Sequence, residues 1–167
     1  MNNNIRKNLI KKNESGFGLL EAVVGISVIS LSLFGTMLAF QLSQQVVREA
    51  GRNTQASFLA EEGIEALKLL RDASWHSKIE ALSAGANYYF NFNGSAWASS
   101  ADNYYVDGIF ERRFVLDNVY RDASSDIAAS GTLDQDAKKA TVYVSWLGRS
   151  GTTTKSISAY ITNLFDN

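Results

Sequence analysis

The feature that most constrains this chain is an uncharged and largely apolar stretch, residues 22–47, with a single glutamate, Glu21, directly before it. A helix of about 20 predominantly apolar residues crosses the hydrocarbon core of a bilayer, so the stretch is long enough to span a membrane. Its first two thirds are rich in Val, Ile, Leu and Phe, and its last third contains several glutamines and a serine. The sequence therefore predicts one membrane-spanning helix that ends in the polar interface.

The charges on either side of this stretch predict its orientation. Residues 1–16 contain four basic residues and one acidic residue, a local net charge of 4 − 1 = +3. The remainder carries 16 − 4 = 12 basic and 17 − 1 = 16 acidic residues, a net charge of −4. Because positive flanks stay on the cytoplasmic side, we expect the N-terminus inside and the C-terminal part outside.

Two ordinary membrane segments share part of this pattern. A secretory signal peptide has an apolar region of about 7–15 residues followed by a small-residue cleavage site. This stretch is longer, and no such site follows it. An uncleaved signal anchor fits the length and the flanking charges. Glu21 argues against a plain anchor, because a carboxylate at membrane depth is costly unless it is paired. No basic residue follows it within one helical turn, so its partner must come from another chain or from processing.

The string GFGLLE at residues 16–21 follows a short basic leader and precedes an apolar helix. It resembles the processing site of type IV prepilins, and the resemblance covers roughly residues 6–50. It implies that a prepilin peptidase cleaves between Gly16 and Phe17 on the cytoplasmic side and that the new amine of Phe17 is N-methylated. Glu21 becomes the fifth residue of the mature chain, which is the acidic position of the family.

The resemblance also implies a domain organisation and a function. Residues 1–16 are the leader, residues 17–47 form the transmembrane or filament-core half of a long helix, and residues 48–167 form a globular pilin-like domain. The chain is then a structural subunit of a type IV pilus or a type II secretion-like filament. Looser similarity in EEGIEALKLLRD and VYVSW points to a minor pilin or pseudopilin.

The partners implied by the resemblance are a prepilin peptidase, other pilin or pseudopilin subunits, an inner-membrane assembly platform and membrane lipid. The protein would first be a single-pass membrane protein and then part of a filament at the cell surface. With a net charge of −1, no basic field indicates a nucleic-acid partner.

Cleavage creates a positive charge with which the carboxylate of Glu21 can pair. The ammonium of Phe17 lies four residues before Glu21, and side chains at i and i+4 share one helix face. The pair can form inside a subunit or between neighbours, where it fixes the axial register more than it adds stability. Gly25 and Gly35 either allow close helix approach or are tolerated background.

Beyond residue 47 the pattern predicts an α+β fold. Apolar residues continue at three- and four-residue steps, so we expect one helix over residues 17–71, about 80 Å long at 1.5 Å per residue. Its outer half carries an apolar stripe against which a C-terminal antiparallel β-sheet packs. Alternating or aromatic runs predict four strands, with a short helix expected within residues 72–86 and a hairpin loop at 148–151. The strands are expected at residues 87–93, 109–121, 140–147 and 155–164.

Few residues indicate chemistry. The chain has no cysteine and one histidine, His76, so one subunit has no thiolate site, multi-histidine site or histidine triad. We expect no enzymatic activity, cofactor or catalytic residue. Four aspartates surround the loop SSDIAASGTLDQDAKK and form either a solvated acidic loop or a weak calcium site, without the spacing of an EF-hand. They are Asp122, Asp126, Asp134 and Asp136.

One alternative function stays open. A single-pass membrane-anchored extracellular binding module would display its aromatic sheet to a ligand without polymerising. The three tryptophans and seven tyrosines are mostly in the outer segments, where they form either a binding surface or sheet core. Such a module needs neither cleavage nor Glu21.

Overall fold

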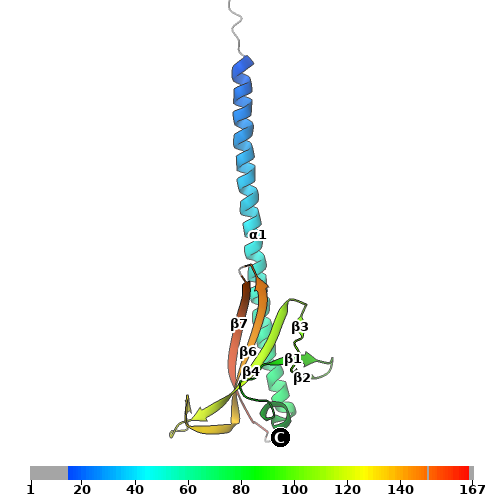
Figure 1. Cartoon of the computed structure of the whole chain (residues 1–167), viewed down its shortest axis with the longest axis vertical. Helices are drawn as coiled ribbons and strands as arrows, with labels where there is room; N and C mark the ends of the chain where they lie inside the picture. The colour runs from blue at the N-terminus through cyan, green and yellow to red at the C-terminus, as the bar shows by residue number, and fades with distance from the viewer. Residues whose placement is uncertain (1–14, 150, 166–167) are drawn as a thin grey trace, which may run out of the picture. The chain divides into compact units, whose positions relative to one another are not determined.

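A computed structural model describes residues 15–149 and 151–165 (Figure 1). Side chains are described from residue 18 onward. The expected leader therefore lies mostly outside the described residues. The chain divides into two units, Met1–Arg48 and Glu49–Asn167, and each is described by itself.

A single helix, α1 (Ser15–Ala73), runs through the end of the first unit and the beginning of the second. The predicted long helix at residues 17–71 is confirmed. The chain has no proline, so no residue in this stretch lacks an amide hydrogen or forces a kink. Every described side chain from residue 18 to residue 48 is exposed, whereas the part of α1 in the second unit buries one stripe.

The buried stripe on the outer part of α1 carries alternating large and small side chains. Together with Trp75 and Ile79, which lie around the short π-helix η1 (His76–Glu80), it forms the helical side of the core. The short helix expected within residues 72–86 is thus confirmed. The buried members of the stripe are Ala56, Leu59, Ala60, Ile64, Ala66, Leu67 and Leu70.

Within the described residues, seven strands form one sheet in the order β2-β1-β4-β6-β7, while the short strands β3 and β5 each pair with β4. Every pairing is antiparallel. The strands are β1 (Tyr88–Phe92), β2 (Trp97–Ser100), β3 (Tyr105–Val106), β4 (Phe110–Arg121), β5 (Ile127–Ala128), β6 (Thr132–Gly148) and β7 (Gly151–Thr162).

The four predicted strands are present, and β6 pairs with β7 as expected, with Gly148 opposite Gly151. Two differences have physical causes. β6 begins at Thr132, because residues 132–134 pair with the end of β4 beyond an irregularity in its ladder. The strands β2, β3 and β5 were not predicted, since they have two to four residues and show no alternation of their own.

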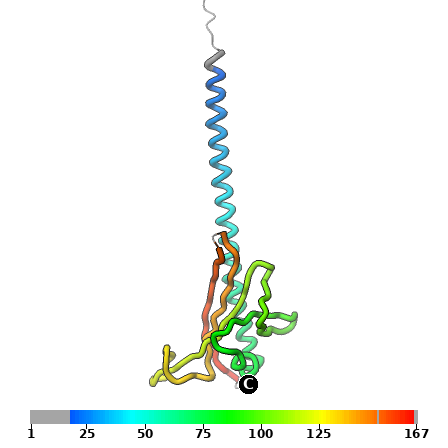
Figure 2. The backbone as a smooth tube through the Cα atoms, in the orientation of Figure 1, coloured from blue at the N-terminus to red at the C-terminus, as the bar shows by residue number. Residues whose placement is uncertain are grey.

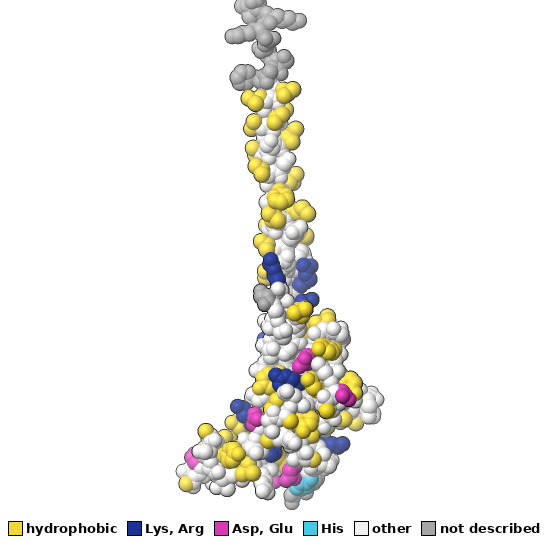
Figure 3. Space-filling view, viewed as in Figure 1, with side chains coloured by type: hydrophobic (Ala, Val, Ile, Leu, Met, Phe, Trp, Pro, Cys, Tyr) yellow, Lys and Arg dark blue, Asp and Glu magenta, His cyan; other side chains and the backbone are white. Residues whose placement is uncertain are grey.

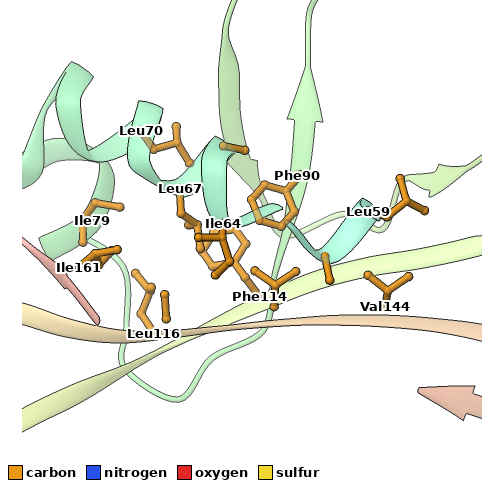
Figure 4. Close-up of a cluster of buried hydrophobic side chains, with 14 of the residues drawn as sticks. Leu59, Ile64, Leu67, Leu70, Ile79, Phe90, Phe114, Leu116, Val144 and Ile161 are labelled. Carbon is orange, nitrogen blue, oxygen red and sulfur yellow. The ribbon is translucent and has the colours of Figure 1, made fainter. Parts of the chain in front are cut away.

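The core lies between the outer part of α1 and one face of the sheet. Figure 4 shows helix side chains such as Leu67 facing Phe114 and Leu116 of β4, Phe90 of β1 and Val144 of β6. The opposite face is polar along β6 and β7, where Thr141 hydrogen-bonds Ser158 at 2.9 Å. A long N-terminal apolar helix whose outer part packs on a C-terminal antiparallel sheet is a pilin-like architecture.

The strands β6 and β7 run alongside the helix within the second unit (Figure 2). The Lys155 ammonium of β7 donates to the Ser57 hydroxyl of α1 at 2.6 Å. Nearer the start of the unit, the Arg52 guanidinium donates to the carbonyl of Leu147 at 3.2 Å. The turn between the two strands therefore lies beside the first residues of the second unit.

Candidate functional site

The expected processing site lies at the beginning of α1. Gly16 and Phe17 have helical backbone, while residues 1–14 and the side chain of Phe17 lie outside what is described. Glu21 follows one turn later and is exposed. Among the described residues no cation forms a salt bridge with Glu21. Its carboxylate is therefore available to a cation from outside this part of the chain.

The apolar surface that follows Glu21 is not covered by protein. Leu31 is 73 % exposed and Phe34 is 63 % exposed, and none of the most apolar window of α1 is buried. Figure 3 shows apolar side chains around the first part of the helix, with Lys and Arg side chains next along it. One described helix, α1, is long and apolar enough to cross a membrane. The core helix of a soluble protein is mostly buried, whereas this window is entirely exposed.

Three hydroxyl groups in the span donate to backbone carbonyls of the same helix. The hydroxyl of Ser27 donates to the carbonyl of Val23 at 2.7 Å, and that of Thr36 donates to the carbonyl of Ser32 at 2.6 Å. The hydroxyl of Ser32 likewise donates one turn back, at 2.9 Å. Because hydrocarbon offers no hydrogen-bond partner, this arrangement makes these polar side chains compatible with a bilayer.

Helical geometry places small side chains on the same face as Glu21. Gly25 follows it by four residues, and Ser32 and Ala39 follow at two further steps of seven. Residues at these steps lie on one helix face. Nothing lies within 4 Å of a side chain built at Gly25, so the face is open. We call Glu21, Gly25, Ser32 and Ala39 the small-residue seam.

The four aspartates do not share one loop. Asp134 and Asp136 lie in β6, and Asp134 accepts from the Arg121 guanidinium at 2.6 Å. The carboxylate of Asp122 accepts from the backbone amides of Ser124 and Asp126, which closes the turn after β4. In the described residues no three His, Cys, Asp or Glu side chains gather into a group that could hold a metal ion. The description of this segment as a single acidic loop is corrected.

His76 lies in η1, where its Nδ1 is 2.5 Å from the carboxylate of Glu80. Its side chain is 59 % exposed. The contact joins two residues four positions apart in the chain.

Sequence reasoning missed Arg112, a buried cation on the core side of β4. Its side chain is 7 % exposed and its guanidinium donates to the half-exposed Glu62 carboxylate at 2.8 Å. The guanidinium carbon lies 5.1 Å from the ring centre of Phe90 and 5.2 Å from that of Trp97. The signal was present, because alternation along β4 places Arg112 on the face of Phe110.

The aromatic side chains divide between core and surface. Trp75 and Trp146 are buried and Trp97 packs against the core. The exposed members include Tyr104 and Tyr105, around β3. Two further tyrosines line an open pocket of about 380 Å³ between β5 and β7, together with Lys139. The lining tyrosines are Tyr120 and Tyr160.

Comparison with protein-family models gives no match, and searches of curated proteins and of solved structures give no significant match.

Proposed function

We propose that this chain is the precursor of a filament subunit, a minor pilin or pseudopilin of a type IV pilus or type II secretion-like filament. The observation that carries the proposal is an uncovered apolar helix that has a carboxylate at its entry and continues, in one piece, into the helix that bears the sheet. A helix of this kind can exchange lipid for neighbouring helices without refolding the globular unit.

The proposed processing supplies a positively charged partner for the carboxylate of Glu21. Cleavage between Gly16 and Phe17 leaves an ammonium about one helical turn before Glu21, within reach of this carboxylate in the same subunit or in a neighbour. A charge pair that forms only at one axial offset rejects other offsets, because a misplaced subunit leaves both charges unpaired away from water. The pair thereby selects the register of assembly.

The small-residue seam supports the same proposal. In lipid the hydrophobic effect does not drive helices together, so association depends on close packing and polar contacts. Gly25, Ser32 and Ala39 let a partner backbone approach on the face that presents Glu21. One helix face would therefore carry both the charge that sets the register and the small side chains that permit contact.

A second candidate function is a membrane-anchored binding module. Exposed aromatic side chains around β3 and the open pocket beside β5 favour it. It gives no role to Glu21 and requires no cleavage after Gly16. The two proposed functions therefore predict different masses for the mature protein.

The test is to co-express the chain with a prepilin peptidase and to measure the N-terminal sequence and intact mass of the membrane-extracted protein. We expect a chain that starts at Phe17 and carries one added methyl group. Gly16→Val should remain uncut, while Gly18→Ala, a matched change two residues away, should be cut normally. A native protein that still starts at Met1 would refute the proposal and favour the binding module.

A further inference from the structure

The turn between β6 and β7 lies against the beginning of the second unit. We call Leu147, Gly148, Arg149 and Gly151 the hairpin tip. The carbonyl of Leu147 accepts from the Arg52 guanidinium at 3.2 Å. A side chain built at Gly148 would come within 3.3 Å of the Glu49 carboxylate. Both partners on α1 follow residue 47, the end of the uncharged stretch, by at most five residues.

This short connection limits how far the hairpin tip can lie from a membrane that α1 crosses. Even a fully extended chain spans at most about 3.6 Å per residue, so five residues reach about 18 Å. In a helix the same residues rise only about 1.5 Å each, or about 8 Å in total. Headgroups add about 5–8 Å on each side of the hydrocarbon core. The hairpin tip is thus held at a short distance from the headgroup layer.

The hairpin tip has the chemistry of a headgroup contact. Leu147 is 72 % exposed and Arg149 is exposed. The guanidinium of Arg52 donates to the carbonyl of Leu147, and the carboxylate of Glu49 lies near Gly148. Guanidinium groups hold phosphates in bidentate geometry.

We propose that the hairpin tip docks on anionic phospholipid headgroups while the precursor is held in the membrane. Arg52 and Arg149 face the lipid phosphates, and Leu147 rests in the headgroup layer. The contact fixes the sheet relative to the membrane surface and is released when the helix leaves the bilayer. The inference rests on the membrane-held stage of the proposed function and adds a lipid partner for the globular unit.

The chain has no cysteine, so a single introduced cysteine is a unique labelling site. The full chain is reconstituted into vesicles of phosphatidylcholine, with or without about one third phosphatidylglycerol, that contain a lipid with a nitroxide on its headgroup. A fluorophore is attached at Leu147→Cys or, as a matched control, at Leu133→Cys. Leu133 is also an exposed leucine of β6 but lies about 45 Å along the strand, at roughly 3.3 Å per residue.

We expect the fluorophore at position 147 to be quenched several-fold more than that at position 133, and more strongly with phosphatidylglycerol present. Arg149→Gln should weaken the gain from anionic lipid about fivefold, the size expected for one cation at a charged membrane surface. Lys139→Gln removes an exposed cation elsewhere on β6 and should leave the gain unchanged.

Alkaline carbonate extraction of the same vesicles separates the two proposals. A chain that carbonate removes is not held by α1, and the proposed function fails. A chain that resists extraction but shows equal quenching at positions 147 and 133, or no response to phosphatidylglycerol, overturns the lipid contact alone. Quenching that appears only at high protein density would assign the hairpin tip to a second copy of the chain and also overturns the lipid contact.

Discussion

At the scale of single residues, Gly63 shows how closely α1 approaches the sheet. A side chain built at this position would lie 2.8 Å from a methyl carbon of Val142 and 3.3 Å from the ring of Phe90. Gly51 lies on the same helix with nothing within 4 Å of such a side chain. Replacing each of these two glycines by alanine therefore separates the cost of crowding against the sheet from the gain in helix propensity.

Gly63→Ala should destabilise the globular unit by about 1–2 kcal/mol. Overpacking costs roughly 1–3 kcal/mol, and replacing glycine by alanine in a helix returns up to about 1 kcal/mol. Gly51→Ala has only the second effect and should stabilise by about 0.5–1 kcal/mol. Urea unfolding followed by tryptophan fluorescence measures both, because all three tryptophans belong to the second unit. Equal shifts for the two variants would contradict the close contact.

A second residue-scale prediction concerns the buried guanidinium of Arg112. Glu62→Ala should destabilise the globular unit by about 1–2 kcal/mol, because a largely buried cation loses its carboxylate. The loss is smaller than the roughly 3–5 kcal/mol typical of a fully buried pair, since Glu62 is 49 % exposed. Glu61→Ala removes the neighbouring exposed carboxylate and should stay within about 0.5 kcal/mol. The same urea titration measures both variants, and a Glu62→Ala midpoint equal to that of Glu61→Ala would show that the ion pair contributes nothing.

Glu21 is the residue on which assembly depends in the proposed function. Glu21→Ala should leave cleavage and membrane insertion intact and block incorporation into filaments, because the new amine of Phe17 then finds no carboxylate. Ser30→Ala changes a polar residue on the opposite helix face and should incorporate normally. Quantifying each variant in sheared filaments against its amount in membranes checks this, and normal incorporation of Glu21→Ala would count against the register role.

At the scale of elements, the two parts of α1 use different surfaces. The outer part buries a stripe against the sheet, which accounts for its alternation of apolar and charged positions. The inner part exposes all its described side chains, and the face that carries the small-residue seam also carries Val28, seven residues after Glu21. A substitution that fills this face should affect helix–helix contact without affecting the sheet.

Gly25→Leu should lower incorporation into filaments about tenfold, because a large side chain in the seam holds a partner backbone away at a cost of the order of 1–3 kcal/mol. Ser30→Leu places the same side chain on the opposite face and should have little effect. Comparing cross-linked subunit pairs for the two variants measures the contact. An equal loss for both would mean that the seam is not the contacting face.

At the scale of the whole molecule, the described core belongs to one unit. In the part of the chain that the structure describes, the buried hydrophobic side chains lie at or beyond Ala56, in the unit Glu49–Asn167. The first unit therefore has an exposed surface and no described core, whereas the second contains the core. A substitution in the first unit should not change the folding stability of the second.

The double variant Glu21→Ala with Gly63→Ala should consequently show additive behaviour. Its urea midpoint should equal that of Gly63→Ala alone, since the two sites belong to different units and are 42 residues apart in the chain. Its resistance to carbonate extraction should equal that of the unaltered chain. A midpoint shifted further by Glu21→Ala would reveal coupling between the units.

The features that depend on local periodicity could be predicted from the amino-acid sequence. The uncharged stretch predicted the apolar helix, three- and four-residue steps predicted its buried stripe, and alternation predicted β4, β6 and β7. These patterns are readable because a helix or a strand imposes its repeat on neighbouring residues. The processing site and the role of Glu21 stay predictions, since they depend on partners.

The tertiary structure alone decided the contacts between residues far apart in the chain. No local pattern indicates that Arg112 meets Glu62, that Gly63 touches Val142, or that the hairpin tip lies beside Arg52. The same holds for β6, whose first five residues are polar apart from Leu133 and become a strand only because the end of β4 offers a pairing edge. Such contacts form between chain segments that the common core brings together, and they contribute to the free energy of folding only once that core has formed.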